Sequence, residues 1–230
     1  MAKTITATNV VTDTAQFKFG SALGNTSARM GHSGDNWLST PDHADFNFGA
    51  NNFTIEFWAR TPDTASNGIF FNQLGASSRA IKSQWLPATP RIQFSYSTNG
   101  TTDTDVNFDG AAFSANVWYH IAFSRSGNDL KCFVNGAQYG STADVTGITI
   151  FDSTAVFKFG GIPAVAESVD GWMDEIRVSN SARYTTNFTE PSAAFSYDAN
   201  TVLLIHCDGA DEGTTFTDGG GSSPSSSISS

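Results

Sequence analysis

The feature that most constrains the fold of this chain is a hydrophobic period of two, which recurs along most of its length. In residues 53–59, Phe53, Ile55 and Phe57 fall on one face of an extended chain, and Glu56 falls on the other. This alternation predicts a half-buried strand. The same period predicts strands in residues 91–96, 117–124, 129–134, 147–151, 156–159, 172–178 and 202–206. We expect no helix longer than a turn or two.

Turn signals separate these runs. Residues 126–129 lie between two predicted strands, and the Asn135-Gly136 pair is typical of a tight hairpin turn. Only 15% of residues are charged and 39% are hydrophobic, a composition that leans towards β-structure. Many short strands with frequent turns predict an all-β fold, a two-sheet antiparallel jelly-roll sandwich. We expect one domain over residues 1–218, followed by a Gly/Ser-rich tail over residues 219–230.

Charge and cysteine content limit the classes of partner. The formal net charge is −10, which argues against binding to nucleic acid because phosphate recognition depends on clustered Lys and Arg. Cys132 and Cys207 each lie in an apolar run and are predicted to be buried free thiols. The first residues lack the apolar stretch of a signal peptide, and no apolar run is long enough to span a membrane. We therefore expect synthesis as a soluble protein in a cytoplasm.

Several motifs in order resemble the laminin-G-like jelly-roll domains of the concanavalin A-like superfamily. The likeness begins at residues 34–49 and 52–58 and extends over roughly residues 15–208; it continues in residues 118–127, 130–136, 171–179 and 182–189. Similar variants occur in structural proteins of bacteriophages and marine viruses. The resemblance implies a non-enzymatic module on a virion surface, as a capsid decoration or a tail or fibre component. Its partners would be other virion proteins or its own copies, and it would be made in the host cytoplasm.

The segment 202–209 departs from the family pattern, because in the family it usually opens a domain and here it comes last. It is either the first strand of a second, truncated repeat or a strand that closes the same sandwich by pairing with the N-terminal strand. We favour closure within the chain, by a strand at about residues 200–208, because the termini of a sandwich often lie close together. Exchange of this strand between subunits is the second choice.

Catalytic patterns are missing from the sequence. The superfamily includes β-glucanases with Glu-x-Asp-x-Glu on one strand, but Glu56 has no carboxylate two residues away on either side. Other hydrolase, nucleotide-binding and zinc motifs do not occur either. His120 and His206 lie in predicted strands and are expected to be packed and hydrogen-bonded. We predict a non-enzymatic protein and keep a glycoside hydrolase as the weaker alternative.

Calcium is the ion that the sequence suits best, because it prefers oxygen ligands. By resemblance to calcium-binding relatives, a site is expected at Asp174 with Asp208 or Asp218. Asp174 shares the predicted inward face of its strand with Ile176, and a buried carboxylate needs backbone donors, an arginine or a metal. Residues 105–110 match the first half of a calcium loop, but their flanks do not, and we expect solvated acids there.

Trp85 is the main candidate for ligand recognition. It lies in residues 83–90, read as a loop because two prolines fix them, and its indole is suited to stack on the apolar face of a sugar. The alternative is that Trp85 plugs one end of the sandwich. Tyr96 and His32 are further candidates for ligand contact. These residues support a second function, a calcium-assisted carbohydrate-binding adhesin that recognises host surface glycans.

Overall fold

The computed structural model describes residues 2–19, 26–31, 36–162 and 169–219. Most of the segments with alternating side chains form strands in it. The described residues form fifteen strands and one short 3₁₀ helix, Ala44–Phe46. The strands are β1 (Thr6–Thr8), β2 (Val11–Asp13), β3 (Ser27–Met30), β4 (Trp37–Thr40), β5 (Phe53–Arg60), β6 (Gly68–Gly75), β7 (Ser78–Leu86), β8 (Arg91–Ser97), β9 (Asp103–Asp109), β10 (Trp118–Ser126), β11 (Asp129–Val134), β12 (Ala137–Asp144), β13 (Phe157–Gly160), β14 (Gly171–Ser179) and β15 (Thr201–Ile205). In this part of the chain no helix has the length and hydropathy needed to cross a membrane.

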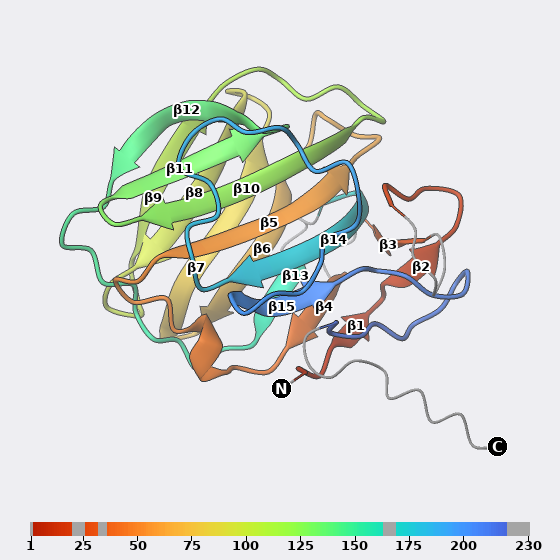
Figure 1. Cartoon of the computed structure of the whole chain (residues 1–230), viewed down its shortest axis with the longest axis horizontal. Helices are drawn as coiled ribbons and strands as arrows, with labels where there is room; N and C mark the ends of the chain where they lie inside the picture. Colours follow the sequence, from red (N-terminus) through yellow and green to blue (C-terminus); the bar gives the residue numbers. More distant parts are fainter. Residues whose placement is uncertain (1, 20–25, 32–35, 163–168, 220–230) are drawn as a thin grey trace.

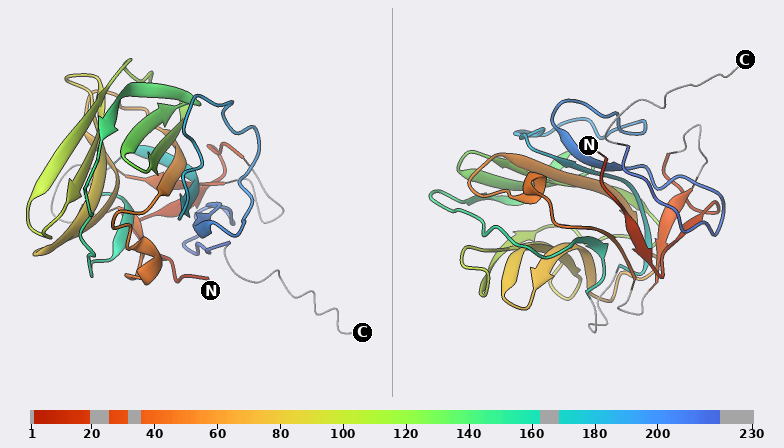
Figure 2. Two further views of the ribbon diagram at one scale, coloured as in Figure 1. Left: turned by 60° about the vertical axis from the view of Figure 1, so that its left-hand side comes forward. Right: turned by 90° about the horizontal axis from the view of Figure 1, so that it is seen from below.

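The strands form two antiparallel sheets that pack face to face (Figures 1 and 2). The seven-stranded sheet has the order β1-β4-β13-β6-β7-β8-β9. The eight-stranded sheet has the order β12-β11-β10-β5-β14-β3-β2, and β15 pairs with β14 beside this path. This arrangement confirms the predicted all-β, two-sheet jelly-roll sandwich.

Phenylalanine rings fill the space between the sheets. Phe71 of β6 is fully buried and meets Phe123 of β10 edge to face, with ring centroids 5.5 Å apart. The predicted inward residues of β5, Phe53, Ile55 and Phe57, are also buried in this core. Both cysteines are free and buried, as the sequence predicted.

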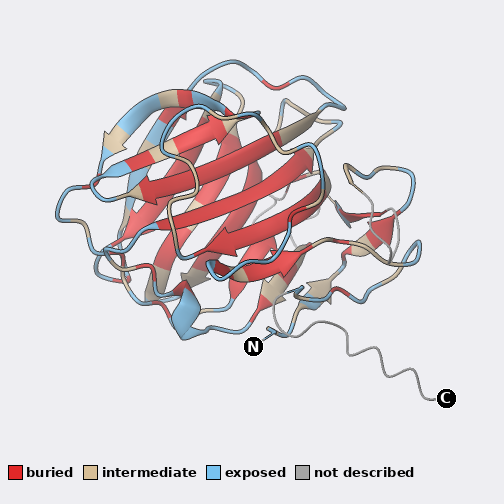
Figure 3. Cartoon of the chain, in the orientation of Figure 1, coloured by how far each residue is buried: buried red, intermediate tan, exposed pale blue. Residues whose placement is uncertain are grey.

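The outer face of β5 is buried as well, which corrects the prediction of a half-buried strand. Residues 180–200, which we call the strap, cross over β11, β10 and β5 on the outside of the eight-stranded sheet (Figure 1). Beneath the strap, Glu56 has an exposed fraction of 0% and Trp58 of 1%. Figure 3 shows the same strands buried along most of their length. The period of two predicted strand β5, but it did not predict that the strap buries the outer face of this strand.

The C-terminal strand completes the eight-stranded sheet of its own chain. β3 pairs with Gly171–Met173 of β14, and β15 pairs with Ile176–Ser179 along the same edge. The partner of β15 is thus β14 and not the N-terminal strand. Residues near the two limits of the described chain nevertheless meet, because Asp218 accepts hydrogen bonds from the backbone N–H groups of Lys3, at 2.8 Å, and Leu204, at 3.0 Å.

A bulge in β14 divides its two pairing regions. The register against β5 shifts between Asp174 and Arg177, and Glu175 has a positive φ of 49°. Met173 and Ile176 both face the main core, whereas Asp174 faces outwards, towards the N-terminal segment. The prediction that Asp174 shares the inward face with Ile176 is therefore wrong, because the extra residue reverses the alternation.

Two local predictions also differ from the structure. β7 extends to Leu86, so Trp85 lies in a strand and not in a loop over residues 83–90. Residues 147–151 form no strand, although Ile150 and Phe151 each donate one backbone hydrogen bond, to Gly49 and Ser97. The predicted tail lies outside the described residues apart from position 219.

Candidate functional site

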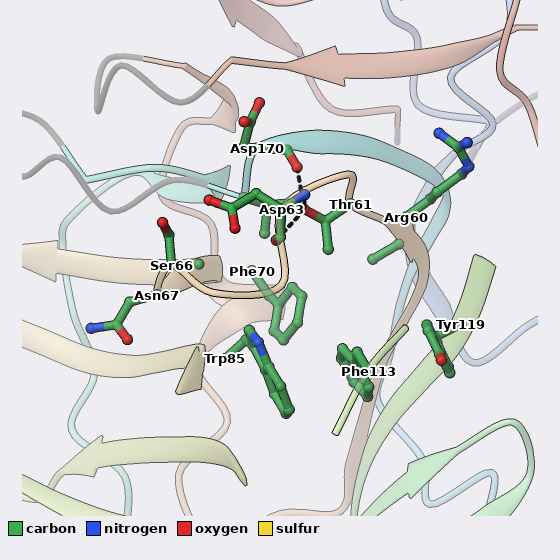
Figure 4. Close-up of a pocket in the computed structure, with 13 residues that line it drawn as sticks. Arg60, Thr61, Asp63, Ser66, Asn67, Phe70, Trp85, Phe113, Tyr119 and Asp170 are labelled. Carbon is green, nitrogen blue, oxygen red and sulfur yellow. Dashed lines mark hydrogen bonds between the residues drawn. The ribbon is translucent and has the colours of Figure 1, made fainter. Parts of the chain in front are cut away.

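A hollow opens at one end of the sandwich, where β5 and β7 end and β6, β10 and β14 begin (Figure 4). Its floor is apolar and consists of Ala59, Phe70, Trp85, Phe113 and Val169. Polar side chains surround the floor: Arg60, Thr61, Asp63, Ser66, Asn67, Tyr119 and Asp170. An apolar floor with a polar rim is typical of ligand sites in proteins.

Three aromatic rings stack in parallel, two from the floor and one from the rim. Phe113 lies between Trp85, at a centroid distance of 4.3 Å and an interplanar angle of 7°, and Tyr119, at 4.5 Å and 16°. Phe113 therefore covers one face of the Trp85 indole, and only 3% of Trp85 is exposed. The indole lines the hollow rather than offering a free face to solvent, which fits the alternative that it plugs the end of the sandwich.

The indole nitrogen of Trp85 is buried, and none of the described residues supplies a hydrogen-bond acceptor for it. Figure 4 shows this nitrogen on the edge of the ring near Phe70, on the side of the loop between β5 and β6. Most buried polar groups in proteins are hydrogen-bonded. A donor left without a partner at the floor of a hollow marks a place where an acceptor is needed.

Hydrogen bonds hold the loop between β5 and β6 in place. The hydroxyl of Thr61 lies 2.7 Å from the carbonyl oxygen of Asp63 and 2.5 Å from that of Asp170. The backbone N–H of Ala65 donates to the Asp63 carboxylate at 2.8 Å. The loop is thereby tied to the start of β14, and the rim has a fixed shape.

A second hollow adjoins the first at Asp170, which lines both. It has a volume of about 390 Å³ and is lined by Asn9, Val11, Arg29, Met30, Gly31, Asn36, Asp170, Gly171 and Trp172. Trp172 donates its indole N–H to Asp13 at 2.9 Å, and the Arg60 guanidinium lies over its ring at 4.7 Å. Trp172 is therefore held in place by the fold.

The other residues predicted to contact a ligand do not join Trp85. Tyr96 is buried in the core with 8% exposed. On β8, the residue opposite Trp85 is Ile92, and Tyr96 lies four residues further along, or roughly 13 Å at the rise of a strand. His32 lies outside the described residues.

The acids predicted to bind calcium are used in backbone hydrogen bonds. The Asp174 carboxylate accepts from the N–H groups of Lys18 at 2.8 Å, Phe19 at 3.2 Å and Glu175 at 2.9 Å. Burial raises the pKa of Asp174 well above its usual range, while the bonds from Lys18 and Phe19 act in the opposite direction. Asp174 therefore anchors the N-terminal segment to the bulge.

Asp218 joins residues near the two limits of the described chain, as noted above, and half-buried Asp208 lies beyond β15. Among the described residues, no group of three His, Cys, Asp or Glu side chains is placed to hold a metal ion. Calcium takes six to eight oxygen ligands, and these acids do not offer them at one point. The arrangement does not fit calcium, and its binding stays a prediction to be tested.

The two histidines in strands pair with buried glutamates outside the hollow. His120 Nε2 lies 3.1 Å from Glu56, and His206 Nδ1 lies 2.8 Å from Glu175. The hydrogen bond that His206 makes to the Glu175 carboxylate raises the pKa of His206. Both glutamates are fully buried, so neither reaches a ligand in the hollow.

Sequence reasoning missed most of the residues that form the hollow. Phe113 is the largest omission, because it occupies the centre of the aromatic stack. Its signal in the sequence is a single aromatic residue within the small and polar residues 110–116. In the structure this ring is buried against the end of the sandwich, with 9% exposed.

The comparisons with known proteins agree with this fold. The binding domain of Paraclostridial Mosquitocidal Protein 1 is similar, with 14% identity, a TM-score of 0.61, and coverage of 79% of this chain and 45% of that one. A "putative carbohydrate binding protein" from Bacteroides ovatus has 15% identity, a TM-score of 0.59, and coverage of 95% and 56%. The binding domain of Botulinum neurotoxin DC, in complex with rat synaptotagmin II, has 14% identity, a TM-score of 0.56, and coverage of 80% and 44%.

The chain spans about half the length of these structures, and at such identities the likeness shows the fold alone. No curated protein matches the chain. The profile described as the concanavalin A-like lectin/glucanases superfamily matches residues 32–187, more than half of the chain. This match and the two-sheet sandwich together show that the chain belongs to the concanavalin A-like lectin/glucanase superfamily.

Proposed function

We propose that this protein is a non-catalytic carbohydrate-binding module and that its glycan binds at the loop end of the sandwich. The observation that carries the proposal is the hollow with an aromatic floor and a polar rim. Sugars present both apolar C–H faces and hydroxyl groups, so a site that combines aromatic rings with carboxylate, amide and hydroxyl groups suits them.

The placement of the hollow supports recognition. The rim comes from loops held by a rigid sandwich, an arrangement that proteins commonly use for binding. The similar structures include two binding domains and the protein from Bacteroides ovatus described above as carbohydrate binding. We extend that property to this chain as part of the proposal.

The positions of the glutamates favour binding over hydrolysis. Most glycosidases need two carboxyl groups on either side of the scissile bond. Glu56 and Glu175 are buried beneath the strap and bonded to protein groups, so they cannot flank a bound sugar. The carboxylates that line the hollow are Asp63 and Asp170, and the carboxylate of Asp63 accepts a hydrogen bond within its own loop. We expect no cleavage of any glycan that binds.

A glycan array tests the proposal, run once with calcium and once with a chelator. We expect binding in both conditions, because the described acids form no calcium cluster. A Ser66→Tyr variant places a bulky ring at the rim and should weaken binding by about 10-fold or more, equivalent to roughly 1.4 kcal/mol. Thr98→Tyr, the same type of change at an exposed position in the turn after β8, should bind like the wild type.

The outcomes separate the alternatives. An absence of binding in both conditions would exclude the proposal. Binding only with calcium would confirm the predicted cation and would mean that the acids rearrange around it. Release of shorter sugars from a bound glycan would instead indicate a hydrolase.

We propose the surface of a virion as the setting of this module. Support comes from the resemblance of residues 15–208 to viral structural proteins. The net charge of −10 is compatible with both a capsid decoration and a tail adhesin. Quantitative mass spectrometry of purified particles tests the setting. A decoration should be present at hundreds of copies and a tail adhesin at a few to tens, and absence from particles would contradict the proposal.

A further inference from the structure

We infer that the group entering the hollow is an acetamido group, so that the ligand is a neutral N-acetylated amino sugar. This inference rests on the proposed function, because it names the sugar class that the same site would take. Three features of the hollow carry it: its size, the unpartnered donor at its floor, and the chemistry of its rim.

The hollow has room for a small group but not for a whole sugar ring. Its cavity volume is about 30 Å³, roughly two to three times the 10–15 Å³ that a cavity needs to hold one water molecule. The floor around this space is apolar, with Phe70 and Trp85 each 3% exposed and Phe113 9% exposed. A methyl group is the part of a sugar derivative that matches this size and polarity.

The indole nitrogen of Trp85 requires an acceptor next to that methyl group. Tryptophan is a donor only, and the buried N–H of Trp85 has no acceptor among the described residues. Stacking against Phe113 at 4.3 Å fixes the plane of the ring, so the donor is held in one direction. A methyl group joined directly to a carbonyl would fill the apolar space and accept this hydrogen bond.

The rim accounts for the remainder of the group. An acetamido group also carries an N–H donor, and Asp63 and Ser66 place acceptor oxygens along the rim. The carboxylates of Asp63 and Asp170 repel an anionic sugar. Arg60, the one cation among the described residues of the rim, lies over the ring of Trp172. The body of the sugar has room in the second hollow, which begins at Asp170 and has a volume of about 390 Å³.

Nuclear magnetic resonance of the ¹⁵N-labelled protein tests this inference through its tryptophan indole signals. The chain has five tryptophans, and a Trp85→Phe variant identifies the signal of Trp85 by its disappearance. We expect that signal to move when N-acetylglucosamine or N-acetylgalactosamine is added. Glucose, galactose and glucosamine, which lack the acetyl group, should bind about 10-fold more weakly and leave the signal in place.

Trp85→Phe keeps an aromatic ring against Phe113 but removes the donor. It should lower the affinity for the acetylated sugars by about 10-fold, a larger loss than for the parent sugars. Trp58→Phe is the matched control, because the Trp58 indole nitrogen is also buried and has no acceptor in the described part of the chain, but lies on the outer face of the sheet, in a separate cluster. It should leave all affinities unchanged.

The outcomes distinguish failure of the acetamido inference from failure of the proposed carbohydrate-binding function. Equal binding of acetylated and parent sugars, with no movement of the Trp85 signal, would overturn the inference while the proposed function stands. Binding of O-acetylated sugars as tightly as N-acetylated ones would overturn the role of the amide N–H. If no sugar binds and the glycan array is also silent, both the inference and the proposed function fail. Should Trp85→Phe not fold, the affinities of the wild type for the acetylated and the parent sugars still decide.

Discussion

A chain that ends after residue 199, before β15, is expected to lose its cooperative unfolding transition and to aggregate. Leu203, Leu204 and Ile205 of β15 are between 0% and 1% exposed. Full burial of one such side chain contributes about 1.5–3 kcal/mol. The three together are comparable with the total stability of a domain, about 5–15 kcal/mol. The truncation also leaves Ile176–Ser179 of β14 without its partner and exposes an unpaired edge.

Thermal unfolding followed by circular dichroism, together with size-exclusion chromatography, measures this effect. The control is a chain that ends after residue 219, which loses only Gly, Ser and Pro residues and a single Ile. It should unfold at the temperature of the full chain. If the shorter chain also melted at that temperature in one transition, residues 200–219 would be a linker and not part of the core.

The fold could be predicted from the sequence because the period of two is a local property. Strands such as β5, β10 and β11 appear within one or two residues of their predicted limits. No strand was predicted over Ser78–Leu86 (β7). Prolines at positions 87 and 90 suggested a loop over residues 83–90, whereas the strand ends at Leu86, just before the first of them. Proline marks the end of a strand, but it does not say how far back the strand extends.

Features that depend on distant parts of the chain could not be predicted in the same way. The burial of Glu56 depends on the strap, more than a hundred residues later in the sequence. The outward direction of Asp174 depends on one extra residue in β14 that the pattern of residues 172–178 does not reveal. A single inserted residue moves every later side chain to the opposite face of the sheet. A strand can therefore be predicted correctly while its side chains are assigned to the wrong face.

The hollow was only partly predictable for a related reason. Trp85 stands out in the sequence as an indole suited to stack on a sugar. In the structure Phe113 covers one face of this indole, so that face is closed to a ligand. That contact joins the end of β7 to the connection before β10, which are far apart in the sequence. Composition identifies aromatic residues, whereas the fold decides which of their faces and edges remain available.

Glu56 is the centre of a buried polar network that holds the strap to the eight-stranded sheet. Its carboxylate accepts hydrogen bonds from Arg177 at 2.9 Å and Tyr184 at 2.8 Å, and lies 3.1 Å from His120. Burial acts to raise the pKa of Glu56, but the hydrogen bond with His120 and the charge of Arg177 outweigh it and lower the pKa. The ionised carboxylate is therefore the form that the folded protein stabilises.

A Glu56→Gln variant is expected to lose about 3–5 kcal/mol of unfolding free energy at neutral pH, because Arg177 stays buried without its counter-charge. Urea unfolding measures the loss. Limited proteolysis should also cut the strap faster, since Tyr184 loses its charged acceptor. Glu212→Gln is the control: its ion pair with Arg29 is exposed, and the change should cost about 0–1 kcal/mol.

The contribution of Glu56 to the free energy of unfolding should decrease as the pH falls. The pKa of Glu56 is lower in the folded protein than its ordinary value of 4.5, so its contribution is fully present above that pH. As the pH falls below 4.5 and through the folded-state pKa, the carboxylate takes up a proton in both states and the contribution is lost. The difference in unfolding free energy between wild type and Glu56→Gln should therefore be constant near neutral pH and shrink in acid. A difference that stayed constant into acid would mean that the shape of the side chain, and not its charge, holds the strap.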